Sequence, residues 1–399
     1  MTRAKKTLVF VVALVLLAVV GLYVAFQMST RSALLRAEAF LFRRMQVTRL
    51  DEGAFRFFYI TNRSPGEDDS TLEGRFSNQR EPGLRFGSYD AAIEPSLGLS
   101  EIFDPSKWFR NEEVDILDER ELDRDRFIGE LQGLTEQAPL QSLLVVVHGY
   151  REQFPSALRK TAFVSHILDL NTPVLLFDWP GDQPGGPLAS YRRAVEVAEA
   201  SGEELARTLE MVIRDVQPQR LWLLANSMGA QVVADAMHLL YQEADLADPE
   251  TELENVVLTA PDVALDDFDD HFKGEIRALT ENLTVYVSSN DRALLASRLV
   301  NRGRRRGEST LDSRDVNQEM VEEAIRLAEL VEPGSDLVTL VDVTPVNRTL
   351  NFHNFYLESP EVFNDLFLRL VNRDPPSSRV LYPIQNREGS IYWVLTRGR

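Results

Sequence analysis

The chain has 399 residues, with 43 Lys and Arg against 62 Asp and Glu, a formal net charge of −19 and no cysteine. A chain this acidic lacks the surplus of cations through which nucleic-acid-binding proteins contact phosphates, so we expect no nucleic-acid partner. The lack of cysteine excludes disulfides, thiolate metal sites and a cysteine nucleophile, and a hydrophobic content of 44% suffices for a large buried core.

The N-terminal end differs from the rest of the chain in charge. Up to Arg49 it carries eight basic residues and one acid, Glu38, and it has no charged side chain between Thr7 and Thr30. The apolar run at 8–26 is long enough to cross a hydrocarbon layer of about 30 Å, so residues 1–30 are predicted to form a cytoplasmic tip and a transmembrane signal anchor. The alternative is a cleaved signal peptide, which usually has a shorter apolar region and a small-residue cleavage site.

Residues 31–54 are predicted to form a juxtamembrane segment that mixes Leu and Phe with Arg. Its amphipathic part, 32–45, is interpreted either as a helical stalk or as a helix lying on the membrane surface. Basic residues precede the apolar run and an acidic body follows it, although four arginines also flank its far side. We therefore expect a single pass through the cytoplasmic membrane, with the body outside the cytoplasm and periplasmic in a cell with an outer membrane.

From residue 55 onward, short apolar runs alternate with longer amphipathic segments, which predicts a doubly wound, mostly parallel sheet with helices on both faces. Antiparallel lead-in strands are expected at 55–61 and 86–93, and polar loops with short helices at 66–82 and 104–126. Buried strands are predicted at 143–147, 174–177, 221–224, 255–258, 283–287 and 337–341. The clearest helices are predicted at 155–168, 191–216, 228–241, 292–300 and 317–330. This body is assigned to 55–375, and residues 376–399 to a C-terminal hairpin of 379–385 and 390–396.

The most informative motif follows the predicted strand at 221–224. It reads Ala225-Asn226-Ser227-Met228-Gly229 and leads directly into a helix. A serine at a strand-to-helix turn, with small residues two positions to either side, matches the nucleophile elbow written G-x-S-x-G, with alanine in place of the first glycine. The elbow needs small residues there because the strained turn presses both positions against neighbouring elements. Ser227 is therefore the candidate nucleophile.

A serine nucleophile needs a base to take its proton, and the chain has five histidines to supply it: His148, His166, His238, His271 and His353. His238 lies eleven residues after Ser227 on the same predicted helix, about 16 Å away along its axis. His353 alone follows the last core strand, which is the place of the base in the chain order serine, acid, histidine. We take His353 as the base; the alternative is a loop histidine packed among aromatic residues.

Two aspartates are candidates for orienting this histidine. Asp291 follows the predicted strand at 283–287, and Asp262 follows the strand at 255–258. The strand after next from the elbow usually supplies the acid, so Asp291 is preferred and Asp262 is the alternative, although either could instead cap a helix. The oxyanion hole is predicted from the backbone N–H groups of Met228 and of Tyr150, in the V-H-G-Y segment that ends an earlier strand.

Several segments together resemble the α/β-hydrolase superfamily, and within it a bacterial family of α/β-hydrolase-like proteins of unknown function. They are Y-I-T-N-R at 59–63, V-V-V-H-G-Y at 145–150, F-D-W-P at 177–180, A-N-S-M-G at 225–229, L-T-A-P-D-V at 258–263, Y-V-S-S-N-D-R-A-L at 286–294 and H-N-F-Y at 353–356. The resemblance covers roughly residues 55 to 370. It implies an α/β-hydrolase fold with a serine-hydrolase site at Ser227, Asp291 and His353, and it supplies no substrate.

The sequence thus predicts a membrane-anchored serine hydrolase, a carboxylesterase-like enzyme that cleaves an ester or related acyl bond in a small-molecule or lipid substrate. The alternative is a catalytically silent α/β-hydrolase fold that serves as an envelope scaffold or ligand-binding module. We expect no cofactor and no metal. The acidic residues at 266–270 lack the D-x-D-x-D-G spacing of a calcium loop, and the chain has no phosphate-binding glycine loop.

Overall fold

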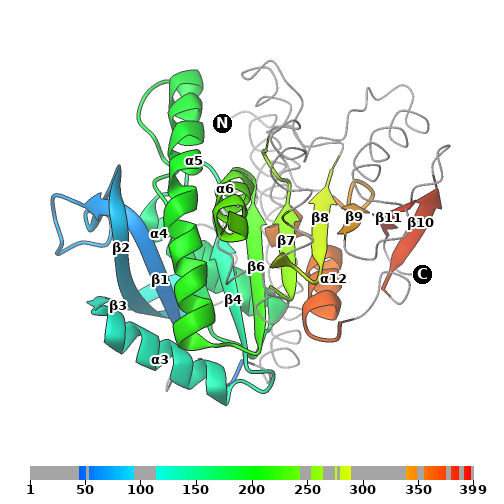
Figure 1. Cartoon of the computed structure of the whole chain (residues 1–399), viewed down its shortest axis with the longest axis horizontal. Helices are drawn as coiled ribbons and strands as arrows, with labels where there is room; N and C mark the ends of the chain where they lie inside the picture. The colour runs from blue at the N-terminus through cyan, green and yellow to red at the C-terminus, as the bar shows by residue number, and fades with distance from the viewer. Residues whose placement is uncertain are drawn as a thin grey trace, which may run out of the picture.

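An eleven-stranded sheet forms the centre of the protein in a computed structural model (Figure 1). The structure describes residues 45–50, 54–93, 114–242, 253–263, 275, 279–288, 338–347, 355–373, 379–385 and 391–396. The strand order is β10-β11-β9-β8-β7-β6-β4-β5-β1-β2-β3. The strands are β1 (Ala54–Pro65), β2 (Phe76–Ile93), β3 (Val114–Leu122), β4 (Ser142–Val147), β5 (Val174–Asp178), β6 (Arg220–Asn226), β7 (Asn255–Thr259), β8 (Leu283–Val287), β9 (Val338–Asp342), β10 (Leu381–Gln385) and β11 (Ile391–Leu395).

The middle of the sheet is parallel, from β1 through β5, β4, β6, β7, β8 and β9 to β11. The pairs β1–β2, β2–β3 and β10–β11 are antiparallel and lie at its two edges. Strands β4 to β8 are buried on both faces, which explains why they are continuous apolar runs in the sequence. Because they are parallel, their carboxyl ends meet at one edge, where open α/β sheets carry their sites.

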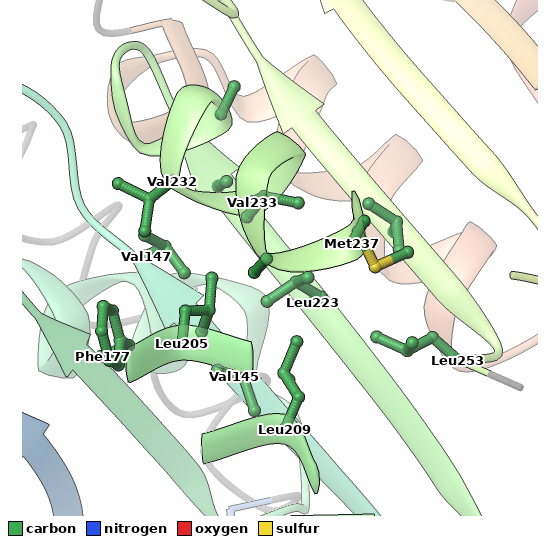
Figure 2. Packing of buried hydrophobic residues seen from close by; sticks show 14 of the residues in the cluster. Val145, Val147, Phe177, Leu205, Leu209, Leu223, Val232, Val233, Met237 and Leu253 are labelled. Carbon is green, nitrogen blue, oxygen red and sulfur yellow. The ribbon is translucent and has the colours of Figure 1, made fainter. Parts of the chain in front are cut away.

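Helices cover both faces of this sheet. Those in the described chain are α3 (Arg124–Gln137), α4 (Phe154–Leu168), α5 (Pro187–Met211) with the π-helical turn η3 (Val212–Val216), α6 (Gly229–Gln242), α11 (Phe355–Glu358) and α12 (Pro360–Leu370). One apolar core joins the sheet to α3, α5 and α6, and a second joins its other face to α4, α11 and α12. Figure 2 shows the first core, in which Leu205 and Leu209 of α5 meet Val145 and Leu223 of the sheet.

The structure confirms the predicted buried strands and the three predicted helices that it describes, α4, α5 with η3, and α6, to within a few residues, and the two C-terminal strands form the expected hairpin. Two expectations for the N-terminal half were wrong. Residues 76–82, expected in a loop, begin the long strand β2. Part of 104–126 forms the edge strand β3 and the start of α3 instead of loops and short helices. The expected antiparallel pairing of β1 with β2 is confirmed, and β1 also pairs in parallel with β5.

The predicted membrane span at 8–26, most of the juxtamembrane segment and the predicted helices at 292–300 and 317–330 lie outside the described residues. Within the residues that are described, no helix is both long and apolar enough to span a bilayer. The anchor and the domain boundaries at 30, 54 and 375 therefore stay predictions.

Candidate active site

Ser227 occupies the turn between β6, which ends at Asn226, and α6, which begins at Gly229. Its φ is +53°, in the left-handed region that residues with a side chain rarely adopt. Three backbone hydrogen bonds hold the turn. The Ser227 N–H donates to the carbonyl of Thr259 at 2.9 Å, and the Ser227 carbonyl accepts from the N–H groups of Ala230 and Asp262, each at 3.0 Å. The sequence motif therefore forms the strained elbow that it predicts.

The residues two positions from Ser227 have no room for larger side chains. A Cβ atom added to Gly229 would lie 2.5 Å from the carbonyl oxygen of His148 and 2.8 Å from that of Val147. Both contacts are with backbone atoms at the end of β4 and at the start of the loop that follows it, which cannot move without disturbing the strand. On the other side, Ala225 is completely buried at the end of β6. These two positions explain the small residues in the motif.

The loop after β4 lies directly against the elbow. A Cβ atom added to Gly149 would be 3.0 Å from the Ser227 Cβ and 3.0 Å from the carbonyl oxygen of Asn226. In the described part of the chain, the backbone N–H groups of Tyr150 and Met228 donate no hydrogen bond to another residue. This arrangement brings together the two segments that were predicted to supply the oxyanion hole.

Aromatic side chains connect this loop to α5 and to Asp262. The Tyr150 hydroxyl donates to the Ser190 hydroxyl at 2.9 Å, and the rings of Tyr150 and Tyr191 meet edge to face with centroids 5.5 Å apart. The Tyr191 hydroxyl in turn donates to the carboxylate of Asp262 at 2.7 Å. Asp262 is buried, and its own N–H contacts the elbow, so the alternative acid lies beside Ser227.

A buried polar network lies behind the loop after β4. The His148 Nε2 is 3.0 Å from Asp178, its Nδ1 is 2.9 Å from the Gly149 carbonyl, and its ring stacks on Trp179. The same aspartate accepts from the Nε of Arg63 at 2.8 Å. Burial alone would raise the pKa of Asp178, but the charge of Arg63 and the hydrogen bond from His148 outweigh it and hold this pKa below its usual value.

The structure brings Ser227, Met228, Tyr150 and Asp262 into one region at the carboxyl ends of β4, β6 and β7. The predicted base His353 and the preferred acid Asp291 lie outside the described residues, so their roles stay predictions. The network around Arg63 was not predicted from the sequence. No local sequence signal marked it: Arg63 lies near the end of β1 and Asp178 at the end of β5, and only the pairing of β1 with β5 brings the two residues together.

Two of the other histidines lie in helices away from Ser227. His166 is buried in α4, and burial lowers its pKa to about 3. His238 is in α6, and its Nδ1 is 2.6 Å from Glu275. Within the described residues, no three His, Asp or Glu side chains form a cluster suited to a metal ion. The acidic residues at 266–270 are not among those described, so the expectation of no metal stays a prediction.

Comparison with known families identifies the chain. The model of the family described as alpha/beta hydrolase of unknown function (DUF900) matches residues 128–372, more than half of the sequence. The chain belongs to this family. The expected α/β-hydrolase fold is thereby confirmed, and the matched region contains the elbow, the loop after β4 and the turn after β7.

Two solved structures show a weaker similarity. An uncharacterized protein from Bacillus cereus ATCC 10987 has 10% identity and a TM-score of 0.36, over 69% of this chain and 68% of that chain. The Pyrococcus furiosus esterase Pf2001 has 14% identity and a TM-score of 0.33, over 57% of this chain and 80% of that chain. No curated protein matches the chain.

Proposed function

We propose that this member of the family is a serine hydrolase that cleaves an ester or related acyl bond of a small-molecule or lipid substrate. The observation that carries the proposal is the left-handed Ser227, φ +53°, at the turn between β6 and α6. A strained serine at this place costs stability and serves no evident role in the core, whereas a nucleophile needs its hydroxyl presented at the strand end. Membership in an α/β-hydrolase family supports the same reaction class.

The reaction follows from the residues assigned to it. The Ser227 hydroxyl oxygen attacks the acyl carbon while His353 takes its proton, and Asp291 orients the imidazole and stabilises its charged form. The negative charge that develops on the substrate oxygen is held by the N–H groups of Met228 and Tyr150. Collapse of the tetrahedral intermediate expels the leaving group, which takes the proton from His353. Water then attacks the acyl-serine while His353 takes its proton. His353 returns this proton to the Ser227 oxygen as the carboxylic acid is released.

The test is the turnover of p-nitrophenyl butyrate by the full-length protein in mild detergent. We expect Ser227→Ala to reduce kcat by about 10⁴-fold or more, because removal of a triad member leaves only binding and oxyanion stabilisation. Ser201→Ala is the matched control, since Ser201 is a buried serine of α5 that contacts Asn62 away from the elbow. Equal turnover by wild type and Ser227→Ala would contradict the proposal. Turnover absent from both, with ligand binding retained, would favour the catalytically silent alternative.

We further propose that residues 1–30 anchor the protein in the cytoplasmic membrane, with the catalytic domain outside the cytoplasm. The support is the uncharged apolar run at 8–26 and the basic residues that precede it. Fusing the C-terminus to alkaline phosphatase, which is active only outside the cytoplasm, should give an active enzyme in the membrane fraction. An inactive phosphatase together with a fluorescent C-terminal green fluorescent protein fusion would reverse the orientation, and a soluble, shortened product would indicate a cleaved signal peptide.

A further inference from the structure

Arg63 makes an unusually complete set of contacts for a buried charge. Its side chain is 1% exposed, and all five of its N–H donors have acceptors. The Nε donates to Asp178 at 2.8 Å and Nη1 to Asp182 at 2.7 Å, with a longer contact to the Ser77 carbonyl at 3.3 Å. Nη2 donates to the carbonyls of Glu152 and Trp179, both at 2.8 Å.

Three of these acceptors belong to the loops that follow β4 and β5, whereas Asp178 is the last residue of β5 and Ser77 lies in β2. Glu152 lies in the loop after β4, and Trp179 and Asp182 lie in the loop after β5. The loops also contact each other, because the N–H of Arg151 donates to the carbonyl of Gly181 at 3.0 Å. One guanidinium group therefore joins both loops to the end of β1.

The same contacts reach the predicted oxyanion loop. Asp178, which Arg63 binds, is 3.0 Å from the Nε2 of His148, and the Trp179 indole donates to the His148 carbonyl at 2.8 Å. The next residue, Gly149, lies against Ser227. A Cβ atom added to Gly181 would lie 3.0 Å from the Gly149 carbonyl oxygen. At most two contacts thus separate Arg63 from the backbone beside Ser227. A displacement of Arg63 would therefore change the position of that backbone.

Stability alone does not account for this arrangement. Removing a charge from water is costly, and apolar side chains of similar volume often stabilise a core as well as a buried ion pair does. What the guanidinium supplies is a fixed, planar set of donors that holds several acceptors in one geometry. Such precision matters most where small displacements change a reaction rate.

We propose that Arg63 is a positioning residue for the oxyanion hole: through Asp178, Asp182 and two loop carbonyls it sets the position of Gly149 and Tyr150 relative to Ser227. This inference rests on the proposed function of Ser227. Arg63 does not touch the substrate and acts only by fixing the loop that does.

The test compares Arg63→Lys with Arg220→Lys in the full-length protein. Lysine keeps the charge but cannot reproduce the fork of donors. Arg220 is a matched control because it is also buried and paired with a carboxylate, Glu254, but lies at the opposite end of β6 from Ser227. Active sites are counted by fluorophosphonate labelling, so that kcat refers to reactive, folded protein. The affinity for an arylboronic acid, which forms a negatively charged tetrahedral adduct with a serine, reports on the oxyanion hole.

For Arg63→Lys we expect kcat per labelled site to fall about 10- to 100-fold, KM to change by less than about threefold, and boronate affinity to fall by the same factor as kcat/KM. Arg220→Lys should lower the melting temperature but leave kcat per site unchanged. An Arg63→Lys protein with unchanged kcat per site and boronate affinity would overturn the inference. If Arg63→Lys does not fold, the Arg63→Met/Asp178→Asn/Asp182→Asn triple variant, which removes Arg63 together with both carboxylates that it pairs with, is held to the same criteria. Wild-type turnover that survives Ser227→Ala would instead overturn the proposed function.

Discussion

The backbone N–H of Asp262 donates to the carbonyl of Ser227 at 3.0 Å, so the turn after β7 is joined directly to the elbow after β6. The carboxylate of the same residue accepts a hydrogen bond from Tyr191 at 2.7 Å. Asp262 thus supports the elbow through its main chain, whatever its side chain does. This distinction between main-chain and side-chain contacts makes the two candidate acids separable by mutation.

Exchanging each aspartate for asparagine tests which one is the acid of the triad. Asp291→Asn should lower kcat by about 10³- to 10⁴-fold, because the base loses its orientation and its stabilising charge. Asp262→Asn should lower it far less, since the N–H bond to Ser227 remains. The comparison uses kcat with p-nitrophenyl butyrate, and Tyr191→Phe controls for loss of the Tyr191 hydrogen bond. A larger loss in Asp262→Asn would assign the role to Asp262.

Gly229→Ala should damage both stability and turnover. The added methyl group would lie 2.5 Å from the His148 carbonyl oxygen, so either the loop after β4 or the elbow must move. We expect a loss of about 1–3 kcal/mol in the free energy of unfolding, measured in urea, together with reduced kcat.

The control for this change is Gly129→Ala, at an exposed position inside α3 where an added methyl group meets no atom within 4 Å. Because alanine favours the helix over glycine, this variant should gain about 0.5–1 kcal/mol and keep full activity. A fully stable and active Gly229→Ala protein would show that the elbow does not need the close approach seen in the structure.

His166 should make the protein sensitive to mild acid. Burial lowers its folded-state pKa to about 3, well below the usual histidine pKa of 6.5. As the pH falls below 6.5, the unfolded chain takes up this proton and the folded chain does not, so stability decreases. The loss between pH 7 and pH 5 should be roughly 2 kcal/mol, at 1.36 kcal/mol for each pH unit below 6.5. Urea unfolding at both pH values should show a smaller decrease in His166→Gln than in wild type, and equal decreases would contradict the assignment.

The parallel strands were predictable because burial on both faces leaves a continuous apolar run, as in L-L-V-V-V before His148. The elbow was predictable because its steric demands act on Ala225 and Gly229, which lie within two residues of Ser227 in the sequence. Strand β3 was not, since V-D-I-L-D-E-R-E-L carries charges on an edge strand that is largely exposed to solvent. Its apolar positions are too few to distinguish a strand from a loop.

The contacts of Arg63 could not be predicted for a different reason. An arginine within a strand normally indicates a solvent-facing position, and nothing in the local sequence shows that four of its five acceptors lie about 90 to 120 residues further along the chain. Pairing of β1 with β5 brings them together, and that pairing depends on the complete topology. Contacts of this kind become visible only once the strand order is known.

Covalent labelling of Ser227 tests most directly whether this serine is the nucleophile. The full-length protein is reacted with a fluorophosphonate, digested and analysed by mass spectrometry, with Ser227→Ala and Ser201→Ala treated in parallel. We expect one phosphonyl group on the peptide that contains Ser227 in wild type and Ser201→Ala, and none in Ser227→Ala. An unlabelled wild-type protein, or label that persists on another residue in Ser227→Ala, would contradict the assignment of Ser227 as the nucleophile.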